Sequence, residues 1–107
     1  MEKYIKDGKV AVLYSPGYGA GWSTEEDGEL AESLIFDPEI VKILLDREDK
    51  WETKIIELCE KKYPKIYTGG VYRLEIEWLN LGQEFKIDEY DGFESIILKE
   101  EVVFYIA

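Results

Sequence analysis

The sequence YIKDGKVAVLY, residues 4–14, predicts a β-hairpin whose second strand lies inside a sheet. Asp7-Gly8 is a strong two-residue turn signal, because both residue types tolerate the positive φ angles that tight hairpin turns require. Residues 9–14 are rich in β-formers and almost continuously apolar. Such a run is typical of a strand that is covered on both faces, or on one face and by a partner.

Two helices are predicted in the middle of the chain. Asp37-Pro38 marks the start of the first, because Asp is a favoured N-cap and Pro a favoured first helical residue. Dense apolar residues then continue to about residue 46. The second helix is expected over residues 50–62, where apolar residues recur every three or four positions until Pro64 ends the pattern.

A third helix is suggested between these segments and the first hairpin. Ser23 or Thr24 could act as its N-cap, and the acidic residues 25–27 would suit its first turn. Gly28 weakens this helix, so that residues 29–34 form either its continuation or a separate short turn.

The last third of the chain has strand patterns. Apolar and polar residues alternate over residues 73–78 and 85–88, and Asp91-Gly92 marks a second hairpin. Return strands are expected at residues 95–99 and 102–106. The order of elements predicts an α+β fold over residues 1–107 as a single domain. Its sheet is expected to be largely antiparallel, with about five to six strands and two to three helices inserted after the second strand.

Composition restricts the partners of this protein. The 107 residues carry 24 acidic and 13 basic side chains, which give a net charge of −11. Such a surface repels phosphate backbones and anionic lipids, so we expect neither direct nucleic-acid binding nor membrane association. It attracts basic proteins, although many cytosolic proteins are acidic for solubility alone. The N-terminus lacks the apolar region of a signal peptide, so a cytoplasmic location is expected.

Most catalytic chemistry lacks its residues. The sequence has no histidine and one cysteine, Cys59. Serine and cysteine triads, histidine-based zinc sites and iron–sulfur clusters are therefore excluded, and no cofactor or metal site is predicted. Carboxylates are abundant, but their clusters lack the spacing of a calcium-binding loop. A binding protein is expected rather than an enzyme, and a hydrolase that uses Mg²⁺ and carboxylates alone is the least favoured alternative.

A glycine-rich loop, residues 16–24, is the candidate binding site. Glycine lacks a β-carbon, so this backbone can approach a ligand closely, and successive N–H groups can form an anion-binding nest. Two aromatic rings in the loop could stack on a base or sugar. The alternative is an irregular loop whose aromatic rings enter the core. The predicted ligand-binding residues are Gly17, Tyr18, Gly19, Ala20, Gly21, Trp22, Ser23 and Thr24.

The loop sequence GYGAGWST also carries a family resemblance. Together with the motifs FDPEIV, KKYP, YTGG, LEIEW and EYDG, it resembles small uncharacterised proteins encoded in phage and prophage genomes. This resemblance implies a phage context, in which small accessory proteins counter host defence. The host cell cytoplasm is then the expected location.

The leading functional hypothesis is a non-enzymatic module that binds or sequesters a nucleotide-like small molecule at the loop. The alternative is an acidic inhibitor that mimics nucleic acid and docks on a basic host protein. The acidic residues that would serve this alternative are Glu25, Glu26, Asp27, Glu29, Glu48 and Asp49. The apolar segment at residues 102–106 also permits edge-to-edge pairing in a homo-oligomer.

Overall fold

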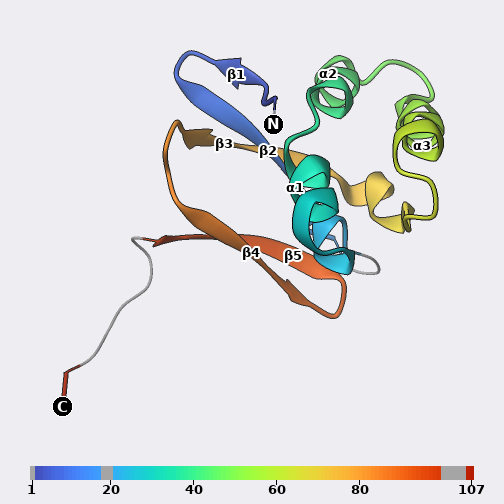
Figure 1. Ribbon diagram of the computed structural model, residues 1–107. Coiled ribbons are helices and arrows are strands. Elements are labelled where there is room, and N and C mark those ends of the chain that lie inside the picture. Colours follow the sequence, from blue (N-terminus) through green and yellow to red (C-terminus); the bar gives the residue numbers. More distant parts are fainter. Residues whose placement is uncertain (1, 18–20, 100–105) are drawn as a thin grey trace.

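The computed structural model describes residues 2–17, 21–99 and 106–107 (Figure 1). Three α-helices follow an N-terminal hairpin and precede three strands. The strands are β1 (Ile5–Lys6), β2 (Lys9–Tyr14), β3 (Glu75–Asn80), β4 (Phe85–Tyr90) and β5 (Phe93–Leu98). The helices are α1 (Gly28–Phe36), α2 (Pro38–Asp46) and α3 (Trp51–Lys62), with short 3-10 helices η1 (Ser23–Glu25) and η2 (Gly69–Arg73). The α+β class and the antiparallel pairing are confirmed.

The strands form two sheets where the sequence predicted one. β2 lies between β1 and β3, and among the described strands β4 pairs only with β5. The β4–β5 hairpin packs its apolar face against β2 and α1 instead of bonding to the edge of β3 (Figure 1). The burial of the apolar side chains of the hairpin against this cluster favours the arrangement. The strand expected at residues 102–106 lies outside the described residues except for Ile106, which is 97% exposed.

Both predicted Asp-Gly turns are confirmed. Asp7 and Gly8 have φ angles of 54° and 76°, and Asp91 and Gly92 have φ angles of 53° and 82°. Two consecutive positive φ angles match the right-handed twist of the strands that they join. These local signals therefore fix the register of both hairpins.

Helices α2 and α3 also follow their sequence signals. The Asp37 carboxylate caps α2 by accepting hydrogen bonds from the backbone N–H groups of Glu39 and Ile40. The first helix differs from the prediction, because α1 begins at Gly28 with a φ of +59°. Ser23 and Thr24 belong to η1 and cap no α-helix, since Thr24 bonds elsewhere, as described below.

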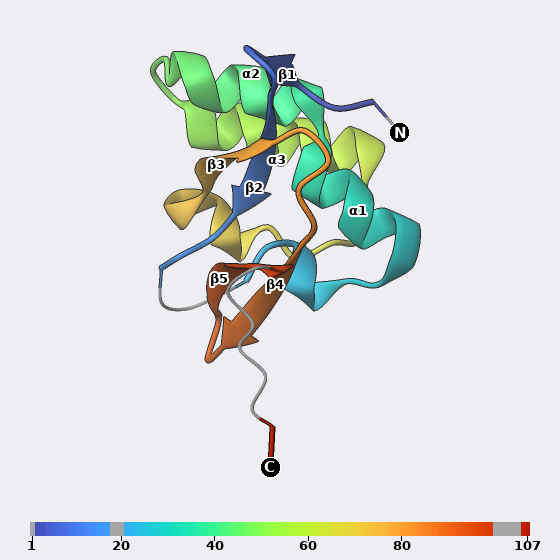
Figure 2. The same cartoon turned by 90° about the vertical axis from the view of Figure 1, so that its left-hand side faces the viewer.

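Strand β2 is buried on both faces, as its apolar run predicts. Ala11 and Leu13 belong to the larger core cluster, which the three helices and η2 complete. Val10 and Val12 face the other side and pack with Phe36 and the β4–β5 hairpin. The end of β2 is therefore held between two layers, and the glycine-rich loop begins there (Figure 2).

Candidate functional site

The described part of the glycine-rich loop joins β2 to η1. Gly17, Gly21, Trp22, Ser23 and Thr24 are described by the structure, and all but Gly17 and Thr24 are buried. The other predicted site residues, Tyr18, Gly19 and Ala20, lie outside the described residues.

A carboxylate of the protein itself lies against the two ends of this loop. The carboxylate of Glu94, from β5, is fully buried against the loop. Its Oε1 accepts a hydrogen bond from the Ser15 N–H at 2.8 Å. Its Oε2 accepts hydrogen bonds from the N–H groups of Trp22 at 2.7 Å and Thr24 at 3.0 Å, and from Thr24 Oγ1 at 2.5 Å. Four hydrogen bonds to one carboxylate offset the cost of burying its charge.

Glycine is required at position 21 by this arrangement. A β-carbon built there would lie 2.6 Å from Thr24 Oγ1 and 3.1 Å from Glu94 Oε2. The backbone at Gly21 thus passes directly over the bound carboxylate. The glycine pattern predicted close approach of the backbone to a ligand, whereas the group that Gly21 approaches here is an internal carboxylate.

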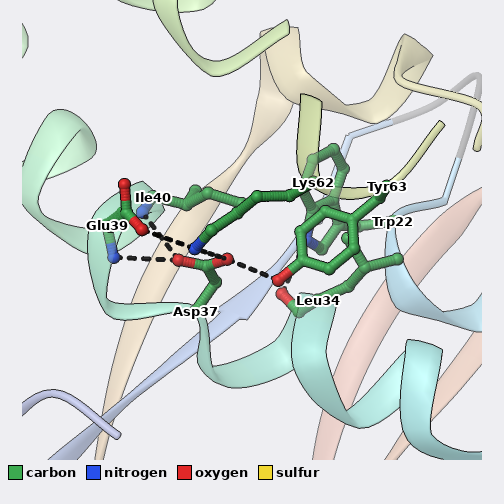
Figure 3. A network of polar contacts seen from close by, with 7 residues as sticks. All are labelled: Trp22, Leu34, Asp37, Glu39, Ile40, Lys62 and Tyr63. Atoms are coloured by element: carbon green, nitrogen blue, oxygen red, sulfur yellow. Dashed lines mark hydrogen bonds and ion pairs between the residues drawn. The ribbon is translucent and has the colours of Figure 1, made fainter. Parts of the chain in front are cut away.

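Trp22 is not available for stacking. Only 1% of its surface is exposed, and its indole Nε1 donates a hydrogen bond to the Leu34 carbonyl oxygen at 2.8 Å (Figure 3). The expectation that its ring stacks on a base or sugar is therefore wrong for this structure. The ring instead fixes the loop to α1, because a buried indole N–H needs a partner.

The aliphatic part of an arginine from η2 packs on the start of the loop. The side chain of Arg73 lies across Gly17: a β-carbon built at Gly17 would lie 2.3 Å from Arg73 Cγ. Arg73 and its neighbour Tyr72 are both exposed, Tyr72 to 63%. We call this surface, made of Gly17, Tyr72 and Arg73, the loop face.

A hydrogen bond links the two segments of the loop face. Ser15 Oγ donates to the Gly70 carbonyl oxygen at 3.2 Å, which ties the start of the loop to η2. The Glu94 N–H donates to the Ser15 carbonyl oxygen at 2.9 Å, which ties the same residue to β5. Figures 1 and 2 show η2 and the turn of the β4–β5 hairpin on the same side of the molecule.

The tyrosine of the β4–β5 turn, Tyr90, points away from the glycine-rich loop. Tyr90 pairs with Phe93, and Glu94 is the next residue along β5. Because successive side chains of a strand alternate between faces, Tyr90 points away from the face that carries Glu94. The structure therefore brings β5 to the loop through Glu94 and not through the turn itself.

The acidic residues of the alternative hypothesis do not form one surface. Residues 25–27 and 29 lie at η1 and the start of α1, whereas residues 48 and 49 lie in the α2–α3 connection. Figures 1 and 2 both place these two segments at opposite ends of the helical part. Glu48 is also paired with Lys54 at 3.1 Å.

A second polar cluster surrounds the buried carboxylate of Asp37 (Figure 3). Besides capping α2, it accepts hydrogen bonds from Lys62 Nζ at 3.0 Å and from the Tyr63 hydroxyl at 2.5 Å. Burial alone would raise the pKa of Asp37, but the hydrogen bonds from Tyr63, Lys62 and the Ile40 N–H hold it below its ordinary value. The contacts with Lys62 and Tyr63 join the start of α2 to the end of α3.

Two hollows lined by described residues lie away from the loop face. One is lined by residues of the Asn80–Glu84 turn and Lys99, and another lies between α2 and α3. Among the described residues, no group of three or more acidic or cysteine side chains is placed to hold a metal ion. No described helix has the length and apolar character that a bilayer span requires.

Comparisons with known proteins add no assignment. A search of protein-family models finds no match, and comparisons with curated proteins and with solved structures find none either.

Two residues of this site were missed in the sequence. Glu94 shares its strand face with Ile96 and Leu98, so a carboxylate on the apolar side of a strand was a readable signal. Arg73 carried no such signal, because its position over Gly17 depends on how η2 packs against the loop.

Proposed function

We propose that this protein is a non-catalytic module that binds a nucleotide-like small molecule at the loop face. The observation that carries this proposal is the Arg73 side chain lying across Gly17. The guanidinium at the end of this exposed side chain can pair with a phosphate, and the exposed ring of the neighbouring residue, Tyr72, offers a stacking surface.

A phage origin is part of the same proposal. Sequestering a nucleotide signal needs no catalytic residues, and it would remove such a signal from a host defence system in the host cytoplasm. The resemblance of the loop and its accompanying motifs to phage and prophage proteins supports this context. The net charge of −11 supports a location away from membranes and nucleic acids.

The first experiment screens nucleotides and cyclic nucleotides by thermal shift, followed by calorimetry of any ligand that stabilises the protein. Arg73→Gln should weaken binding by about tenfold or more, because it removes a charge-assisted contact. Arg47→Gln is the matched control. Arg47 is the other arginine of the chain, and its guanidinium already pairs with Glu75 at 3.0 Å.

A second variant tests the geometry of the loop face. Gly17→Ala places a methyl group where the Arg73 side chain lies, so the arginine must move. Binding should weaken in Gly17→Ala as it does in Arg73→Gln. A melting temperature that no nucleotide raises would reject the proposed ligand class, and unchanged affinity in both variants would reject the loop face.

A further inference from the structure

We infer that Glu94 is the positioning residue of the loop face: its buried carboxylate joins the two ends of the glycine-rich loop and so fixes the surface on which a ligand binds. This inference rests on the proposed function for its consequence in binding. Its structural part, the hold of Glu94 on the loop, stands on the hydrogen bonds alone.

The two carboxylate oxygens have separate tasks. Oε1 binds the N–H of Ser15, where the loop leaves β2. Oε2 binds the N–H groups of Trp22 and Thr24, where the loop enters η1. One rigid, planar group therefore sets the separation of the two ends of the loop.

Hydrogen bonds connect Glu94 through Ser15 to η2, the short helix that carries Arg73. Ser15 is bonded to Glu94 through both its N–H and its carbonyl oxygen, and its Oγ is bonded to Gly70 of η2. Arg73 belongs to the same short helix and lies over Gly17. A change at Glu94 is thus transmitted to both segments of the loop face through Ser15.

The chemistry requires an acceptor oxygen at both positions rather than any side chain of this shape. The groups that Glu94 accepts from in the described structure are three N–H groups and one hydroxyl. Glutamine would replace one oxygen with an NH₂ group, which would meet an N–H donor in either orientation of the amide. Glu94→Gln keeps the volume of the side chain and still cannot satisfy the loop.

The test uses Glu94→Gln and Glu94→Ala, with Glu60→Gln as a matched control on the exposed side of α3. Hydrogen exchange and amide proton shifts of Trp22 and Thr24 are followed by NMR. Exchange of both amides should accelerate by more than about tenfold in the Glu94 variants, because each loses a charge-assisted hydrogen bond. Glu60→Gln should leave both amides unchanged.

Chemical rescue separates positioning from general stability. Glu94→Ala leaves a vacancy lined by the same donors, and added formate should occupy it and restore the amide shifts, whereas chloride at equal concentration should not. If a nucleotide binds the wild type, its affinity should fall in Glu94→Ala and recover with formate. The inference would be overturned if formate did not change the chemical shifts of the loop amides in Glu94→Ala. It would also be overturned if Glu94→Gln had fast-exchanging loop amides and still bound the nucleotide with wild-type affinity.

The outcomes remain distinguishable from failure of the proposed function. If no nucleotide binds the wild type, the proposed function fails, and the amide and formate measurements still decide whether Glu94 holds the loop. If neither Glu94 variant folds, hydrogen exchange of the loop amides in the wild-type protein decides whether Glu94 holds the loop. The Ser15, Trp22 and Thr24 amides should then open together, since one carboxylate holds all three, and independent opening would contradict the inference.

Discussion

At the scale of the residue, Asp37 links the stability of this protein to pH. Its pKa is lower in the folded protein than its ordinary value of 3.8, because the hydrogen bonds that it accepts outweigh the effect of burial. A carboxylate with a lowered pKa contributes stability that is complete above this ordinary value and is lost as the pH falls through the folded-state value. The contribution of Asp37 is therefore present at neutral pH and disappears in acid.

Substitution of Asp37 should remove this dependence. Asp37→Ala should lower the free energy of unfolding by about 2–3 kcal/mol at pH 7, because it deletes a helix cap and charge-assisted hydrogen bonds. Urea unfolding of both proteins between pH 7 and pH 2 would measure the free energy of unfolding. Below about pH 4, Asp37→Ala should lose less stability than the wild type does. Asp46→Asn, at the exposed end of the same helix, is the control. An equal acid dependence in Asp37→Ala would contradict the assignment.

Cys59 should be unreactive in the folded protein. It is fully buried, and burial together with the negative charge of Asp37 raises the pKa of its thiol to about 11. Because the thiolate is the nucleophile, alkylation by iodoacetamide at pH 8 should be roughly a hundredfold slower than in the unfolded chain. Mass spectrometry of native and urea-unfolded samples would measure both rates. Similar rates would show that the end of α3 opens readily.

At the scale of the element, the start of α1 reverses an ordinary rule. Glycine in a helix normally destabilises it relative to alanine. Gly28 has a φ of +59°, however, and no atom lies within 4 Å of a β-carbon built there, so strain alone decides the result. Gly28→Ala should lower stability by about 1–2 kcal/mol, the cost of a left-handed conformation in an L-residue. Glu29→Ala, one position later, should cause no such loss, and a stabilised Gly28→Ala would show that α1 can begin elsewhere.

Elements whose signals are local were predictable from the sequence. Asp37-Pro38 fixed the start of α2, and both Asp-Gly pairs gave hairpin turns, because capping and positive φ depend on adjacent residues. The start of α1 was missed since Thr24 bonds Glu94, 70 residues away in the chain, rather than capping a helix. The division into two sheets was missed for a related reason. It depends on which face of the β4–β5 hairpin packs against β2, and alternation within a strand does not specify its partner.

The candidate site was predictable only in part. The glycine pattern led us to expect successive N–H groups that bind the anion of a ligand, whereas the N–H groups of Ser15, Trp22 and Thr24, at the two ends of the loop, bind the carboxylate of Glu94. That contact spans 79 residues from Ser15 and 72 from Trp22. Trp22 looked equally suited to stacking or to the core, because an indole ring is both flat and apolar. Its burial was settled by the position of Leu34, which no local pattern reveals.

At the scale of the whole molecule, the net charge of −11 opposes the local charge of Arg73. An anionic ligand at the loop face is attracted by one guanidinium at contact distance and repelled by carboxylates spread over the surface. Salt screens these two effects unequally, since the Debye length falls from about 30 Å at 0.01 M to about 8 Å at 0.15 M. The long-range repulsion is largely removed over this range, while a contact pair is weakened much less.

The sign of the salt dependence should therefore identify the partner. For a nucleotide at the loop face, the affinity should stay constant or rise as salt increases from about 0.01 M to about 0.15 M. For a basic protein attracted by the acidic surface, the affinity and the association rate should both fall steeply over the same range. Calorimetry of the ligand at several salt concentrations measures this sign, with Arg73→Gln as the comparison. A nucleotide affinity that collapses with salt would show that the ligand depends on long-range attraction, which a surface of this charge cannot give to an anion.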